Sequence, residues 1–289
     1  MRATAIEFRL RMWIQIVIVI LGFWAPWIQP SWPIDLGRRV ALLEWLALEL
    51  SRTGLVRFAY AAPIVIVAGS LVAALGTVLR VWGAAYLGYS TVHHADMQAG
   101  GVMAGGPYRY VRNPLYLGGW CMMIAVSLMM PPSGALFAIV LEGIFFLRLI
   151  LGEEAYLAGQ LGEPYQAYLG TVPRLIPRLR SPLPPSDAKP RWLAAISTEI
   201  TAIGIFAAVA FFSWRFDNQL MVNVVLIAFL VSMVERGLIS ARIPTGVFVV
   251  ATAAGWGLLH LRPLRAAIIA LGIAIVVYAI LPGKITSPR

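Results

Sequence analysis

The chain has 289 residues, of which 60% are hydrophobic and only 12% are charged, and its mean hydropathy is +0.80. Soluble domains are about 45–50% apolar and ~25% charged, so this composition excludes a soluble globular enzyme and a disordered chain. The net charge of +10 comes from basic residues that stand mostly in short loops and at the ends of apolar runs. Membrane proteins are oriented by that distribution, so we expect a membrane protein and no nucleic-acid partner.

Seven or eight apolar runs approach the roughly 20 residues that a helix needs to cross ~30 Å of hydrocarbon. Their approximate bounds are 12–28, 61–88, 115–130, 134–150, 194–213, 220–234, 244–260 and 266–281. The sequence therefore predicts an all-α fold, a polytopic membrane bundle of about eight transmembrane helices.

Two features before residue 60 are interpreted separately. The run 12–28 follows three arginines and lacks a small-residue cleavage site, so we expect a retained anchor and not a signal peptide. The segment 36–58 mixes charges with Leu and Trp at helical spacing, which predicts an amphipathic helix at the interface or a solvated cap.

The runs 115–130 and 134–150 are separated only by Pro131, Pro132 and Ser133, so they must form an antiparallel helix pair. An amino terminus in the cytoplasm places most basic residues on the cytoplasmic side, as the positive-inside rule requires. The polar segments 89–114 and 151–193 then both face the cytoplasm.

A proline-, serine- and charge-rich stretch, RSPLPPSDAKPR, divides the chain near residue 180. We interpret residues 1–180 as the core, 181–193 as a linker and 194–289 as a carboxy-terminal transmembrane module of unknown role. Within that module, Glu199 interrupts an apolar run. It either lines a pocket, binds a neighbouring helix or stays wet at the membrane edge.

The first polar cluster is the stretch 100–116, which leads directly into an apolar run. Its four glycines allow backbone amides to approach a ligand closely. Asn113 followed by Pro114 predicts a helix start, with the Asn side chain as the cap. Beside Arg109 and Arg112, such a helix start is suited to a carboxylate or phosphate.

The second polar cluster begins at Arg148 and includes the adjacent pair Glu153 and Glu154. Glu142 lies eleven residues before Glu153, on the same face of a continuous helix. Because the intervening helix pair returns to the same membrane surface, the two polar clusters are expected to face each other. The alternative is that the arginines only anchor the protein and the glutamates are solvated.

Two strings in these clusters carry a family resemblance. GPYRYVRNPLYLGG is followed about 40 residues later by FFLRLILGEEAYLAGQLGEPYQAYLGTVPRLIP. Together they resemble the isoprenylcysteine carboxyl methyltransferase and phospholipid methyltransferase superfamily, over about residues 76–178. Asn113 stands where His is common in that superfamily, and Leu161 stands where Phe is common.

The resemblance implies an integral membrane methyltransferase that binds S-adenosylmethionine without a Rossmann domain, at the cytoplasmic ends of its helices. The methionyl carboxylate would suit Arg112 and the helix start. The ammonium or the ribose would suit the glutamates, and the sulfonium would suit a tyrosine ring. The expected cofactor-binding residues are Gly106, Tyr108, Arg112, Asn113, Pro114, Tyr116, Glu153 and Glu154.

The acceptor is expected to be a lipid or an isoprenoid, with a carboxylate or an amine as the methylated group. Arg148 would hold a carboxylate acceptor, and His94 or Glu153 would take the proton from an amine. A single cysteine, Cys121, and three histidines predict no metal site. Arginine outnumbers lysine 21 to 2, which favours a GC-rich prokaryotic source and its cytoplasmic membrane.

Two alternatives remain open at this stage. A sterol-reductase-like enzyme with a nicotinamide cofactor would need a second phosphate-binding cluster, which the sequence does not display. A transporter or scaffold would favour internal symmetry and charges at mid-membrane, whereas the polar residues here gather at one surface.

Overall fold

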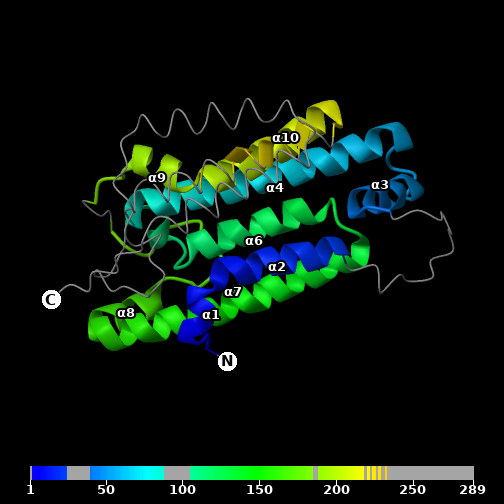
Figure 1. The fold of residues 1–289 in the computed structure, drawn as a ribbon. Coiled ribbons are helices and arrows are strands. Elements are labelled where there is room, and N and C mark those ends of the chain that lie inside the picture. Colours follow the sequence, from blue (N-terminus) through cyan, green and yellow to red (C-terminus); the bar gives the residue numbers. More distant parts are fainter. Residues whose placement is uncertain are drawn as a thin grey trace, which may run out of the picture.

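The computed structural model describes residues 2–24, 40–87, 105–184 and 188–217, with a few further positions between 220 and 232. Every regular element in these ranges is a helix, which confirms the all-α prediction (Figure 1). The helices are α1 (Ala5–Arg9), α2 (Arg11–Trp24), α3 (Leu42–Arg52), α4 (Phe58–Leu87), the 3-10 helix η1 (Gly106–Arg109), α6 (Pro114–Ser127), α7 (Pro132–Leu161), α8 (Glu163–Thr171), α9 (Trp192–Thr198) and α10 (Ile200–Arg215).

The described helices support a membrane protein with fewer spans than predicted. Helices α4 and α7, of 30 residues each, are long and apolar enough to cross a membrane, and α9 with α10 adds a third if the bent pair is one span. Helices α2 and α6 are apolar but have only 14 residues each. The predicted runs 220–234, 244–260 and 266–281 lie largely or wholly outside the described residues.

The helices of the core pack in the order α2, α7, α6 and α4. Helices α9 and α10 pack against α4, and Figure 1 shows α10 on the side of α4 away from α7. Helices α6 and α7 form the predicted antiparallel pair, but their connection ends two residues earlier than expected. Pro132 already belongs to α7, because a proline in the first turn removes an N–H group that has no helical partner.

Helix α3 forms inside the segment predicted to be an amphipathic helix. It buries Leu43 and Ala47, while the side chain of Arg52 stays largely exposed. The N–H groups of Leu42 and Leu43 donate to the carbonyls of Met130 and Leu128, at 2.8 and 2.9 Å. These bonds satisfy the free donors at the helix start and tie α3 to the α6–α7 turn.

The predicted run 194–213 is not one continuous helix. It breaks at Glu199 into α9 and α10, which are inclined by 69°. Glu199 has φ −107° and ψ 21°, outside the helical region, and its side chain is buried. A break of this kind is tolerated in a membrane only where protein surrounds it.

Helices α4 and α6 are in tight contact at two glycines, Gly76 and Gly118. A Cβ at Gly118 would lie 2.6 Å from the carbonyl oxygen of Gly76 and 2.7 Å from Cγ of Arg80. Small residues at such crossings allow helix backbones in a membrane to touch. The α4–α6 contact therefore requires glycine at this position.

We expect Gly118→Ala to destabilise the protein, because the helix backbones must separate. Overpacking costs about 1–3 kcal/mol, against up to ~1 kcal/mol gained in helix propensity. The matched control is Gly159→Ala on α7, where an added Cβ meets no atom within 4 Å. In detergent, the thermal unfolding temperature of Gly118→Ala should be lower than that of the wild type, and that of Gly159→Ala should be equal or higher. Equal losses in both variants would contradict the packing argument.

The end of α4, the start of α6 and the end of α7 meet at one end of the bundle (Figure 1). From Pro132 to Glu153 the rise along α7 is about 32 Å, and from Phe58 to Arg80 along α4 it is about 33 Å. Both distances match the ~30 Å hydrocarbon thickness. Polar residues beyond these points are therefore at or past one membrane boundary.

Candidate active site

The segment that enters α6 is held by the segment that follows α8. The N–H of Arg112 donates to the carbonyl of Pro173 at 2.9 Å, and the N–H of Arg178 donates to the carbonyl of Tyr110 at 3.1 Å. The Tyr168 hydroxyl, buried in the small core of α8, donates to the carbonyl of Tyr108 at 2.8 Å. The two predicted polar clusters therefore do lie against each other.

Glu154 is the centre of this contact. Its Oε2 accepts from Nη2 and Nε of Arg174 at 2.8 and 3.0 Å, and its Oε1 lies 3.4 Å from Nη1 of Arg112. The side chains of Glu154 and Arg112 are only 7% and 11% exposed. A buried carboxylate is stable here because two guanidinium groups compensate its charge.

Asn113 stands at the predicted helix start, but its side chain does not cap the helix. Its amide instead donates to Oε1 of Glu154 at 3.3 Å and to the carbonyl of Arg174 at 3.2 Å. The cap prediction was wrong because the buried carboxylate competes for the same amide donor. Pro114 occupies the first turn of α6, as predicted.

Glu153 has a different partner from its neighbour. Successive helix residues point about 100° apart, so Glu153 faces α6 while Glu154 faces the loop segments. The Tyr116 hydroxyl donates to Oε2 of Glu153 at 3.1 Å, and the Tyr116 ring packs edge-on against Phe146. Glu142, one carboxyl further into α7, is 2% exposed, and its Oε2 has no hydrogen-bond partner among the described residues.

Three buried donor atoms in η1 and the segment between η1 and α6 lack partners in the described part of the chain. They are the Tyr108 hydroxyl, Nε of Arg109 and Nε of Arg112. Buried polar atoms are rarely left without a hydrogen bond in folded proteins, so these three fit a polar ligand. Carboxylate and hydroxyl groups of a ligand would match guanidinium and phenol donors.

The Tyr108 hydroxyl stays protonated. Burial raises the pKa of Tyr108 well above its ordinary value; Glu153, Tyr168 and Glu199 add to the rise, and the positive charge of Arg80 opposes it. The hydroxyl is therefore available as a hydrogen-bond donor.

Gly106 is required by geometry. It has φ +52°, where residues with a Cβ are strained, and an added Cβ would overlap the ring of Tyr86. This places the Tyr86 ring against the glycine turn, a contact that no spacing in the sequence indicated. Gly100, Gly101 and the predicted proton acceptor His94 lie outside the described residues.

Arg148 has a partner that the sequence did not predict. Its Nη2 donates to both carboxylate oxygens of Glu7 in α1, at 2.8 and 2.9 Å. The amino-terminal segment is anchored a second time, because the N–H of Ala3 donates to the carbonyl of Arg148 at 3.0 Å. A role for Arg148 at the acceptor therefore has to coexist with this ion pair.

The hydrogen bonds from Arg148 hold the pKa of Glu7 at about 2, against an ordinary value of 4.5. Since the native state stays ionised where the unfolded chain takes up a proton, the contribution of Glu7 is complete above about pH 4.5. It is lost as the pH falls through 2.

We expect the thermal unfolding temperature of the wild type to fall between pH 5 and pH 3 more than that of Glu7→Gln. Arg148→Ala removes the main cause of the depressed pKa and should flatten the profile in the same way. Parallel profiles for wild type and Glu7→Gln would contradict this assignment.

Sequence reasoning missed two arginines. Arg174 belongs to the VPRLIP string, but nothing in its spacing pointed to a carboxylate twenty residues earlier on α7. Arg80 stands near the end of α4 and pairs with Glu199, so binding a neighbouring helix is the outcome for that glutamate. For Arg80, the available signal in the sequence was that a lone arginine stands within an apolar run.

The fold and the buried charged cluster together describe a helical membrane protein with a polar site at one end of its bundle. The phospholipid methyltransferase family model matches residues 64–163, from α4 to the end of α7. The predicted superfamily resemblance is thereby confirmed for this segment, and the family match indicates a membrane methyltransferase. Residues 164–178, which include Arg174, lie beyond the match. Comparison with curated proteins and with solved structures gave no match.

Proposed function

We propose that the protein is an integral membrane methyltransferase that uses S-adenosylmethionine and acts on a lipidic or isoprenoid acceptor at the cytoplasmic interface. The observation that carries the proposal is the buried contact between Arg112 and Glu154 across the ends of α6 and α7. Both residues lie inside the segment matched by the phospholipid methyltransferase family. The unpartnered donors of Tyr108 and Arg112 support a polar ligand at that place.

In this proposal, each cofactor group has a counterpart in the site. Arg112 and the start of α6 bind the methionyl carboxylate, with Gly106, Asn113 and Pro114 shaping the backbone around it. Glu153 and Glu154 favour the ammonium and the ribose hydroxyls. The rings of Tyr108 and Tyr116 attract the sulfonium cation through their faces.

S-adenosylmethionine supplies an electrophilic methyl group on a sulfonium. The acceptor's lone pair forms the new bond to the methyl carbon, and the carbon–sulfur bond breaks with its electrons passing to sulfur. The chain's own task is to position both reactants and exclude water. A carboxylate acceptor releases no proton. An amine releases one, for which Glu153 or His94 is the proposed acceptor.

A membrane location suits an acceptor with an apolar tail. The tail enters between helices from the bilayer, while the polar head meets the site at the boundary reached by the ends of α4 and α7. The positive-inside distribution of basic residues supports the cytoplasmic side for this boundary.

Calorimetry on the purified full-length protein in detergent tests cofactor use. We expect S-adenosylmethionine and its demethylated product to bind at one site, and adenosine alone to bind more weakly. Absence of heat from both cofactor forms, with a cooperative unfolding transition retained, would overturn the proposal.

Labelling identifies the acceptor and the orientation. Membranes that contain the protein are incubated with methyl-labelled S-adenosylmethionine, and the labelled lipid extract is analysed by mass spectrometry. Inside-out vesicles should incorporate label and sealed right-side-out vesicles should not. The reverse pattern would contradict the cytoplasmic orientation, and label confined to the aqueous phase would contradict a lipidic acceptor.

A further inference from the structure

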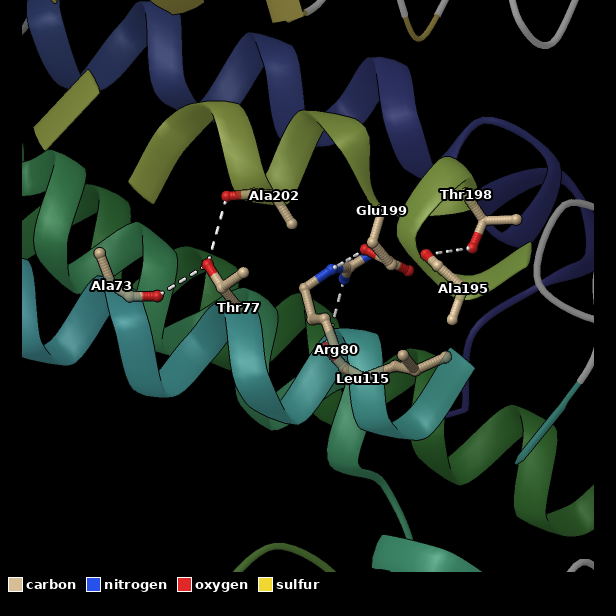
Figure 2. A network of polar contacts seen from close by, with 8 residues as sticks. All are labelled: Ala73, Thr77, Arg80, Leu115, Ala195, Thr198, Glu199 and Ala202. Atoms are coloured by element: carbon tan, nitrogen blue, oxygen red, sulfur yellow. Dashed lines mark hydrogen bonds and ion pairs between the residues drawn. The ribbon is translucent and has the colours of Figure 1, made fainter. Parts of the chain in front are cut away.

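An ion pair between a buried glutamate and a partly exposed arginine lies at the break between α9 and α10. Glu199 is 1% exposed, and its two carboxylate oxygens accept from Nε and Nη2 of Arg80 on α4, at 2.6 and 3.1 Å (Figure 2). Removing a carboxylate from water in an apolar bundle is unfavourable unless both oxygens are bonded and the charge is compensated. Figure 2 shows the guanidinium group of Arg80 facing the carboxylate group of Glu199. Two parallel hydrogen bonds require this arrangement.

The bend of the chain fits this pair. Glu199 precedes the first residue of α10, so its carboxylate lies near the positive end of that helix. One turn further, the Thr77 hydroxyl of α4 lies 3.0 Å from the carbonyl of Ala73 and 3.3 Å from the carbonyl of Ala202 in α10 (Figure 2). Two polar contacts therefore join α10 to α4 where apolar packing alone would leave their relative position free.

The same guanidinium also reaches α6. Nη1 of Arg80 donates to the carbonyl of Leu115 at 3.3 Å (Figure 2). The Arg80 side chain also passes close to Gly118, since a Cβ there would lie 2.7 Å from Cγ of Arg80. Leu115 lies in the first turn of α6, directly before Tyr116 and three residues after Arg112. One side chain thus connects the broken helix, α4 and the helix start that carries the candidate site.

The charges of Arg80 and Glu199 also act on Tyr108 in the candidate site. Among the charged groups that affect the pKa of Tyr108 after burial itself, Glu199 raises it and Arg80 lowers it. Tyr108 lies in η1, and its carbonyl accepts a hydrogen bond from the hydroxyl of Tyr168 in α8. The ion pair is therefore part of the same electrostatic environment as Glu153.

We propose that Arg80 and Glu199 are a positioning pair through which α9 and α10 hold the first turn of α6 in place beside the ends of α7 and α8. The inference rests on the proposed function for its catalytic meaning. It assigns a role in the cofactor site to helices that lie outside the family match, at residues 192–215. The pair acts through Leu115 and touches no reactant.

Hydrogen exchange with mass spectrometry tests the positioning without reference to activity. In full-length Glu199→Gln we expect faster exchange of the amides of residues 117–119, which bond to the first turn of α6. Amides in the middle of α7 should exchange at the wild-type rate. The matched control is Glu49→Gln, which breaks the exposed Glu49–Arg52 ion pair on α3. Unchanged exchange at 117–119 in Glu199→Gln would overturn the proposal.

A charge exchange separates positioning from mere stability. Arg80→Glu combined with Glu199→Arg restores the ion pair, but a carboxylate at position 80 cannot donate to the Leu115 carbonyl. We expect this double variant to be more stable than Glu199→Gln but less stable than the wild type, because a guanidinium at position 199 faces the positive end of α10. The fast exchange at 117–119 should persist. Recovery of both would mean that the ion pair only stabilises the bundle, and the proposal would fail.

Cofactor affinity gives the functional readout. We expect Glu199→Gln to raise the KM for S-adenosylmethionine about 2- to 30-fold, as coupled networks do, with a smaller change in the KM for the acceptor. Arg80→Lys, which keeps the charge but not the three-point contact, should show part of that rise if Glu199→Gln does not fold. An unchanged KM in folded variants with fast exchange would overturn the catalytic meaning.

The failure of the proposed function is distinguishable from the failure of this inference. A wild type that binds no S-adenosylmethionine, with exchange at 117–119 still dependent on Glu199, supports the positioning pair and rejects the methyltransferase proposal. A wild type that binds the cofactor, with exchange independent of Glu199, does the opposite.

Discussion

Replacing Glu154 with glutamine is expected to have the largest effect of any single change in the site. Glutamine keeps the shape, but its amide donors face the guanidinium groups of Arg112 and Arg174, which lose their shared anion. Breaking a buried ion pair by removing one partner costs about 3–5 kcal/mol in unfolding free energy. Thermal unfolding in detergent measures that loss, and calorimetry with S-adenosylmethionine measures the accompanying loss of binding in the folded protein.

A second substitution checks the charge argument. Adding Arg174→Gln to Glu154→Gln removes one of the two unpaired cations, so the double variant should be more stable than Glu154→Gln alone. Glu163→Gln on α8 is the control, because this glutamate is exposed in the next helix along the chain. Additive losses from the two substitutions would mean that Glu154 and Arg174 do not interact as the structure indicates.

Replacing Arg112 with alanine is expected to weaken S-adenosylmethionine binding by about 10- to 150-fold, the range for a hydrogen bond to a charged group. The reason is the loss of the guanidinium proposed to hold the methionyl carboxylate. Comparing S-adenosylhomocysteine with 5′-methylthioadenosine separates contacts to the amino-acid end from contacts to the nucleoside, because the latter lacks both the carboxylate and the ammonium. Only the affinity for S-adenosylhomocysteine should fall.

Two variants control the Arg112 experiment. Arg178→Ala removes an exposed cation from the same segment and should leave both affinities unchanged. Arg112→Lys keeps the charge without the forked donors and should lose part of the affinity. Equal losses for both ligands in Arg112→Ala would show that the residue maintains the structure around Glu154 and does not contact the carboxylate.

The helical class, the helix pair and the meeting of the two polar clusters followed from local signals in the sequence. Apolar run length predicted α4 and α7, and Asn113–Pro114 predicted the start of α6. The short connection near Pro131 required residues before 114 and after 150 to return to one surface. The superfamily strings predicted the family whose model matches residues 64–163, although the second string continues to residue 177, beyond that match.

The choice of partners was decided only by the tertiary structure. Arg174, Arg80 and Glu199 carry no periodic signal, because each pairs with a residue on another helix, from 20 to 119 positions away. The same holds for Arg148 and Glu7, which are 141 positions apart.

Hydropathy measures how strongly each segment of a sequence prefers lipid to water. It therefore determined that this chain forms apolar helices and where their polar ends lie. It does not report which buried charge compensates which, because a side chain finds its counter-ion through packing of distant segments. The sequence by itself therefore predicted the helices and the polar surface, and the fold decided that Glu154 joins Arg112 to Arg174 and that Glu199 joins α10 to α4.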